Sequence, residues 1–165
     1  MSLIPWFVIA FLTALNALYV AAEFAAVASK RSALMPLARD GDRSAAAFMD
    51  LLKDGIALDR YIAACQIGIT LSSLVAGAYA QSTIAQELAP ILERAFVLDS
   101  SVAHSIAAGS VLLALTAVQV VLGELVPKSL ALQFPERTAL ATFGAMRWSI
   151  SLYRFFIWLL NGTGF

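Results

Sequence analysis

The sequence predicts an all-α membrane protein with three transmembrane helices per subunit. Of its 165 residues, 61% are apolar and 13% are charged, and the mean hydropathy is +0.82. A soluble domain of this length is usually about half apolar and about a quarter charged, so this chain has too few polar side chains to cover a water-exposed surface. The apolar residues gather in three long runs, which also excludes a disordered chain.

Charge and metal-binding side chains narrow the function further. The net charge is zero, so the whole chain has no general attraction for nucleic acid. Cys65 is the single cysteine and His104 the single histidine, which excludes an internal disulfide, a cysteine-cluster zinc site and a histidine metal cage. The sequence has no nucleophile–base pair, phosphate loop or dinucleotide glycine pattern, so we expect no enzyme.

The first apolar run, residues 3–28, is long enough to cross a bilayer, because about 20 apolar residues span the hydrocarbon core. It carries one charge, Glu23, and one amide, Asn16. A signal peptide would have a basic start and a shorter apolar region, so we interpret the run as an uncleaved span.

Two further runs follow. Residues 61–80 carry no charge, and we expect Gly68 and Gly77 to let neighbouring helices approach closely. Residues 102–132 form the third run, which is interrupted by Gly123, Glu124, Pro127 and Lys128.

The last stretch, residues 137–160, has the pattern of a juxtamembrane amphipathic helix. Arg147 and Arg154 are seven residues apart and share one helical face. A basic helix with many aromatic residues is expected to lie in the membrane interface. The alternative is a fourth span with two snorkelling arginines. The apolar surface comes from Phe143, Trp148, Phe155, Phe156, Trp158 and Leu159.

The distribution of basic residues predicts the orientation. Residues 29–60 hold six lysines and arginines, whereas residues 81–101 hold only Arg94, so the first connection is cytoplasmic and the second is outside. The N-terminus is then outside and the C-terminus is cytoplasmic. Residues 44–53 are expected to form a short cytoplasmic helix after the turn at Asp40, Gly41 and Asp42.

We therefore divide the chain into two parts. Residues 1–136 form the three-span domain, including the helical cytoplasmic segment 29–60. Residues 137–165 form the juxtamembrane helix and, from Asn161 to Gly164, the start of a linker to a further domain.

The strongest functional signal is Glu124 in the third run. Pro127 has no N–H and clashes with the carbonyl of Gly123, so that carbonyl loses its helical partner beside a carboxylate. Two hard oxygens in one place suit Mg²⁺ or Na⁺, and broken helices with free carbonyls are typical cation sites of transporters. The alternative is an ordinary proline kink in which Glu124 pairs with Lys128.

Other polar side chains of the runs can supply supporting oxygens. Asn16 and Glu23 are seven residues apart on one face of the first run, and Gln66, Thr70 and Ser73 share a face of the second. We expect some of them to converge with Glu124 in a pocket. For Asn16 the alternative is interhelical polar contact, and Glu23 is either such a partner or a half-snorkelled carboxylate.

Three segments resemble the signature segments of the CorC/CNNM family, also known as haemolysin-C-like proteins. They are residues 16–25 (NALYVAAEFA), 66–71 (QIGITL) and 122–131 (LGELVPKSLA). The resemblance implies a homodimer in the cell membrane with three spans and a helical cytoplasmic belt. It also implies a following pair of CBS domains that bind ATP, and Mg²⁺ export by alternating access, driven by Na⁺ influx.

The resemblance carries over residue by residue. The Gly-Glu-x-x-Pro element is intact at Gly123, Glu124 and Pro127, which implies Mg²⁺ recognition by the glutamate. Magnesium-transport branches have serines where this chain has Val20 and Ala22, and asparagines where it has Gln66 and Thr70. Some relatives export other cations such as polyamines.

The expected Mg²⁺ ligands are therefore the carboxylate, one carbonyl and three supporting side chains. Two alternatives remain: a non-transporting membrane anchor for a nucleotide-sensing CBS module, and an exporter of an organic cation. The ligand set is Glu124, Gly123, Gln66, Thr70 and Asn16, supported by Glu23, Ser73, Pro127 and Lys128.

Overall fold

A computed structural model describes the backbone of residues 3–163 and the side chains of residues 3–153, and all regular elements in that part are helical. Three stretches are long and apolar enough to cross a membrane, which confirms the all-α prediction with three spans. The first is α1 (Ile4–Ala28), the second joins α4 (Gly55–Ser82) to α5 (Ile84–Phe96), and the third joins α6 (Ser100–Val118), η1 (Gln119–Leu125) and α7 (Val126–Gln133).

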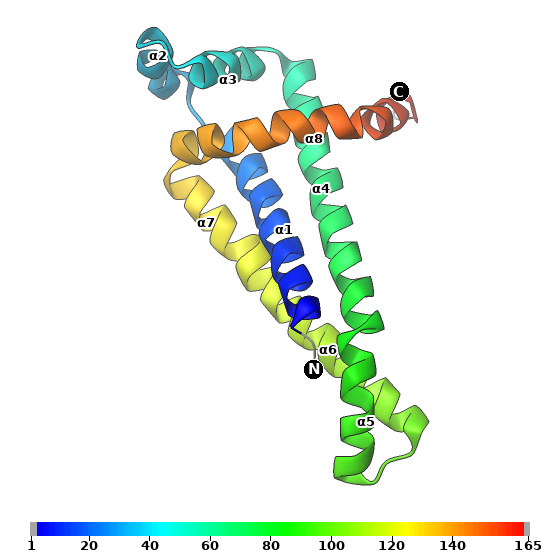
Figure 1. Cartoon of the computed structure of the whole chain (residues 1–165). Helices are drawn as coiled ribbons and strands as arrows, with labels where there is room; N and C mark the ends of the chain where they lie inside the picture. The colour runs from blue at the N-terminus through cyan, green and yellow to red at the C-terminus, as the bar shows by residue number, and fades with distance from the viewer. Residues whose placement is uncertain (1–2, 164–165) are drawn as a thin grey trace.

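The remaining helices gather at one end of the molecule. There, α2 (Arg31–Arg39) and α3 (Arg43–Lys53) connect α1 to α4, and α8 (Pro135–Thr163) lies across α1, α4 and α7 (Figure 1). The opposite end is formed by α5 and the start of α6 (Figure 1). The long helices thus run side by side between two differently built ends.

The short helix predicted over residues 44–53 is confirmed as α3. Its start is fixed by Asp42, whose carboxylate accepts the backbone N–H groups of Ser44 and Ala45 at 2.8 and 3.1 Å. The preceding turn is confirmed by Gly41, which has a φ of +94° that favours glycine.

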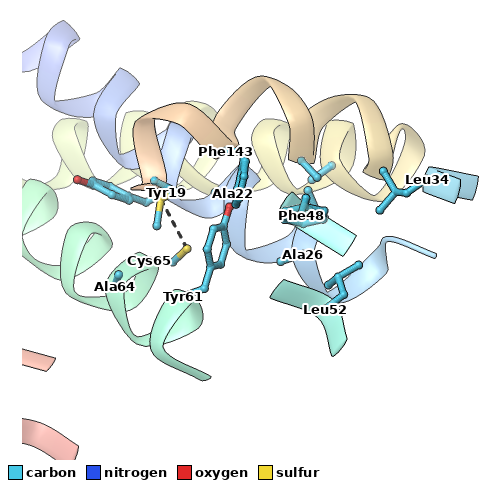
Figure 2. Packing of buried hydrophobic residues seen from close by; sticks show 14 residues of the cluster. Tyr19, Ala22, Ala26, Leu34, Phe48, Leu52, Tyr61, Ala64, Cys65 and Phe143 are labelled. Carbon is cyan, nitrogen blue, oxygen red and sulfur yellow. Dashed lines mark hydrogen bonds between the residues drawn. The ribbon is translucent and has the colours of Figure 1, made fainter. Parts of the chain in front are cut away.

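Small residues of α1 let the first two spans pack closely. Ala22 and Ala25 are fully buried, as is Ala64 on α4. At the end of this contact, Phe48 packs edge-on against Tyr61 and Phe143, with ring centroids 6.2 and 5.3 Å apart (Figure 2). The short helix α3 is thereby fixed to both α4 and α8.

The prediction about close-packing glycines is confirmed for Gly68 and wrong for Gly77 within one subunit. A Cβ at Gly68 would stand 2.5 Å from the ring of Tyr19, whereas one at Gly77 would meet nothing within 4 Å. The Tyr19 hydroxyl in turn hydrogen-bonds Ser149 at 3.0 Å and Tyr153 at 3.1 Å on α8. The Tyr19 ring therefore links α4, α1 and α8.

We expect Gly68→Ala to destabilise the fold by about 1–3 kcal/mol, because the Tyr19 ring must move and its hydroxyl contacts move with it. Gly77→Ala is the matched control on the same helix and is expected to be neutral or slightly stabilising. Thermal melting of the two variants in detergent makes the comparison. Equal melting temperatures would contradict the tight contact.

Two helices differ from expectation. The connection over residues 81–101, where the apolar runs predict no helix, contains α5, with Ile84, Ala85 and Ala89 buried. In addition, α4 begins six residues before the apolar run, because Asp54 caps it by accepting the N–H groups of Ile56 and Ala57. Hydropathy alone misses both, because charged residues interrupt these helices.

The C-terminal helix forms over the predicted stretch and continues beyond it. The backbone is helical through Thr163, so the segment expected to begin a linker at Asn161 extends the helix instead. Arg147 and Trp148 are exposed on α8. Outside the described side chains lie Arg154, Phe155, Phe156, Trp158 and Leu159, and Gly164 lies outside the described backbone.

Candidate functional site

A π-helical segment, η1, occupies the part of the third span that carries the Gly-Glu-x-x-Pro element. Its hydrogen bonds skip one residue more than in an α-helix, as in the bond from the N–H of Val126 to the carbonyl of Val121. The helix break predicted here is not seen: the helix is widened at η1, and the backbone stays helical through Pro127. Such π segments occur frequently at functional sites.

Asn16 joins all three spans at this segment. Its side chain is fully buried, and its Nδ2 donates to the carbonyl of Gly123 at 3.2 Å. That carbonyl cannot accept an N–H from Pro127, so Asn16 supplies a donor for it. The Oδ1 atom of Asn16 accepts from Ser72 and Ser73 on α4, at 3.1 and 3.2 Å. The contact between α1, α4 and η1 is therefore polar and specific.

Gly123 has no space for a side chain. A Cβ there would stand 2.7 Å from Oε1 of Gln119 and 2.8 Å from Nδ2 of Asn16. Glycine at this position therefore allows the Asn16 amide to reach the backbone of η1.

Glu124 follows directly and is exposed on the surface of the single subunit. Lys128 does not pair with it; its Nζ lies 4.5 Å from the ring centroid of Phe24, over the ring face. Within the described residues, the one ion pair joins Lys53 and Asp50. The alternative of a kink closed by a Glu124–Lys128 pair is therefore not seen. A carboxylate exposed to lipid is costly, so Glu124 needs a cover or a cation.

Two other predicted residues form a separate pair. Nε2 of Gln66 lies 3.5 Å from a carboxylate oxygen of Glu23, and the Thr70 hydroxyl donates to the carbonyl of Gln66 at 2.9 Å. Glu23 is two helical turns from Asn16 along α1. The predicted ligands thus fall into three sets. Asn16 and Gly123 form a buried group with the half-buried Ser73 beside them, Gln66 and Thr70 are exposed next to the half-buried Glu23, and Glu124 is exposed on the surface.

The chemistry available here is that of oxygen ligands with little charge. The described residues contain no group of three or more histidine, cysteine, aspartate or glutamate side chains that could hold a metal ion. A cation at η1 would therefore be bound by one carboxylate together with carbonyl, amide and hydroxyl oxygens. Hard ions such as Mg²⁺ and Na⁺ accept such ligands.

Sequence reasoning missed three polar residues of the buried group. Ser72 lies beside both Asn16 and the carbonyl of Gly68, at 3.1 and 2.7 Å. Thr13 and Gln119 are buried and lie one turn before Asn16 and Gly123. The available signal was their spacing, since each stands three or four residues from a residue already singled out.

Comparisons with known proteins agree on one family. The family model described as "Cyclin M transmembrane N-terminal domain" matches residues 7–164. In Bacillus subtilis, the UPF0053 protein YhdT is 36% identical over 152 residues, covering 92% of this chain and 32% of that protein. UPF0053 protein YhdP from the same organism is 34% identical over 163 residues, covering 99% of this chain and 36% of that protein. The "Polyamine export protein" of Haemophilus influenzae is 25% identical over 146 residues, covering 88% of this chain and 33% of that protein.

The chain thus spans 32% and 36% of the length of the two Bacillus relatives, and corresponds to one part of each. The family match covers all three spans and the three motifs that suggested the resemblance. The chain belongs to the CNNM family of transmembrane domains.

Proposed function

We propose that this chain is the membrane domain of a transporter that exports Mg²⁺, working by alternating access in a homodimer and driven by Na⁺ influx. The observation that supports it most is that the carboxylate residue Glu124 directly follows Gly123 in a π-helical segment of a stretch able to cross a membrane. Ionisable groups at such places mark ion pathways. Transport, and not catalysis, is the role that these residues serve.

A site with a single carboxylate suits a cation that must be released better than a cation that stays bound. Mg²⁺ takes six oxygens in near-octahedral geometry. Glu124 and Gly123 would provide the first two, and Asn16, Gln66 and Thr70 would contribute when the helices close around the ion. The remaining positive charge favours release. A second copy of the chain would cover the exposed face of Glu124, which supports the homodimer.

The ends of the molecule suit an orientation in the plasma membrane. We place the basic α2–α3 end in the cytoplasm and α5 outside, because basic residues favour the cytoplasmic side. The helix α8 would then lie in the cytoplasmic interface. ATP would act only through CBS domains that follow this membrane domain, with α8 leading to them.

The direct test is a flux measurement with the purified protein in proteoliposomes loaded with Mg²⁺. We expect Mg²⁺ movement that depends on the protein and increases when a Na⁺ gradient is applied in the opposite direction. Liposomes without protein are the control. A folded dimer that moves no cation would favour the alternative of a membrane anchor for a nucleotide-sensing module.

A second candidate substrate is an organic cation. The Haemophilus relative named a polyamine export protein favours it, and so do Val20, Ala22, Gln66 and Thr70, which replace the residues of magnesium-transport branches. Competition separates the two substrates. If Mg²⁺ is the substrate, we expect Mg²⁺ flux to persist in the presence of excess spermidine. Loss of Mg²⁺ flux together with transport of spermidine would favour a polyamine as the substrate.

A further inference from the structure

In the described part of the chain, two polar side chains near the contact between α1 and η1 are buried without a partner: Gln119, which lies beside Gly123, and Thr13, one turn before Asn16. Both amide atoms of Gln119 and the hydroxyl of Thr13 make no hydrogen bond within the part of the chain that the structure describes. Gln119 is 9% exposed and Thr13 is 6% exposed. In a bilayer such groups are strongly disfavoured unless something polar meets them. A small polar molecule bound there would supply the missing hydrogen bonds.

The atoms that face this point favour water over a bare cation. Oε1 of Gln119 and Nδ2 of Asn16 both lie within 2.8 Å of the position where a Gly123 Cβ would stand. Asn16 uses one of its two amide protons on Gly123 and keeps the second free. The surroundings thus offer both N–H donors and oxygen acceptors, a combination that water can satisfy completely. Water accepts from the donors and donates to the oxygens.

These groups lie where a bound water would stand beside the path of the transported cation. Both α1 and the third span run from the side of α5 toward α8 (Figure 1). Thr13 and Gln119 precede Asn16 and Gly123 by one turn, so they lie nearer the α5 end. A cavity of about 530 Å³ lies between α1 and α6 on that side, and Thr13 forms part of its wall together with Ile9, Val111 and Val118. The rest of the wall is apolar. Thr13 therefore belongs both to the wall of this cavity and to the unpartnered polar groups, and its hydroxyl oxygen is buried.

We propose that Thr13, Asn16 and Gln119 bind an ordered water molecule inside the membrane, and that this water rehydrates the cation as it leaves Gly123 and Glu124 toward the α5 end. The hydration role rests on the proposed transport function. The water site itself rests only on the unpartnered groups. Gln119 is thus a positioning residue, which holds the water and does not hold the ion.

A structure of the dimeric protein at a resolution that reveals ordered water tests the site. We expect a water within hydrogen-bonding distance of the Thr13 hydroxyl and the Gln119 amide. Gln119→Leu, an apolar replacement of similar size, tests the role. We expect Mg²⁺ to raise the melting temperature of the wild-type protein, because it binds the folded state. Gln119→Leu should leave that rise unchanged and slow Mg²⁺ flux about tenfold, because the leaving ion meets an apolar wall.

Thr116→Val is the matched control, because Thr116 is exposed on α6 and its hydroxyl donates only to the carbonyl of Leu112. A dry site at Thr13 and Gln119 would overturn the proposal, and a higher melting temperature of Gln119→Leu would agree with that result. An ordered water with unchanged flux in Gln119→Leu would overturn the hydration role. If wild type shows no Mg²⁺ flux at all, the transport function fails while the observed water stands.

Discussion

Replacement of Glu124 by glutamine is expected to abolish Mg²⁺ transport and the Mg²⁺-dependent rise in melting temperature. Glutamine keeps the size of the side chain and one oxygen but removes the negative charge, which is the only one in the residues proposed to hold the ion at η1. Changes in groups that merely orient a metal ligand cost about 10- to 100-fold in affinity, so loss of the carboxylate ligand itself should cost about 100-fold or more.

The measurement is a Mg²⁺ titration of the melting temperature, since a ligand that binds only the folded state raises it with concentration. Glu87→Gln on α5 is the control, because it removes the same charge at a place outside the site. Glu23→Gln gives the intermediate case, since Glu23 contacts Gln66. An intact dimer of Glu124→Gln that is still stabilised by Mg²⁺ to the wild-type extent would refute the role of this carboxylate.

Glu124 also shows how the predicted site and the observed one relate. Its carboxylate, the Gly123 carbonyl and the proline could be singled out from the sequence, because each is anomalous by itself in an apolar helix. The sequence could not place Gln66 beside Glu23 and Asn16 beside Gly123. Which side chains meet depends on how α1 is rotated between α4 and η1. That rotation is set by packing such as the contact of the Tyr19 ring with Gly68.

The third span shows a second limit of prediction from the sequence. Its apolar run predicted the helix well, and the structure extends it only slightly at each end, to Ser100 and Gln133. The π-helical segment, however, adds backbone to one turn and changes which residues share a face on either side of it. Spacing rules for α-helices therefore fail between residues on opposite sides of η1.

The three long apolar helices were predictable for the same physical reason that made the site only partly predictable. A long apolar run is a property of a single stretch of chain, whereas a site depends on how several stretches pack. The helix α5 was missed because Glu87, Glu93 and Arg94 make its hydropathy that of a loop, although Ile84, Ala85 and Ala89 line one buried face.

Gly123→Ala is expected to disable the site while retaining Glu124. The added methyl would stand 2.8 Å from Nδ2 of Asn16, and that amide cannot withdraw without giving up its bonds to the Gly123 carbonyl, Ser72 and Ser73. We expect a destabilisation of about 1–3 kcal/mol, typical of an overpacked site, and Mg²⁺ flux at background. Gln119, the other neighbour of the methyl, has a long side chain that can turn away.

Gly109→Ala provides the comparison, because Gly109 lies on α6 in the same span and an added Cβ there meets nothing within 4 Å. It should transport Mg²⁺ like wild type and melt at the same or a higher temperature, since alanine favours helix. If Gly123→Ala kept both wild-type stability and wild-type flux, the Asn16 contact would be dispensable. Both variants add the same methyl group to the same span. Loss of flux in Gly123→Ala with wild-type behaviour of Gly109→Ala would therefore tie transport to the place where the buried Asn16 amide joins α1, α4 and η1.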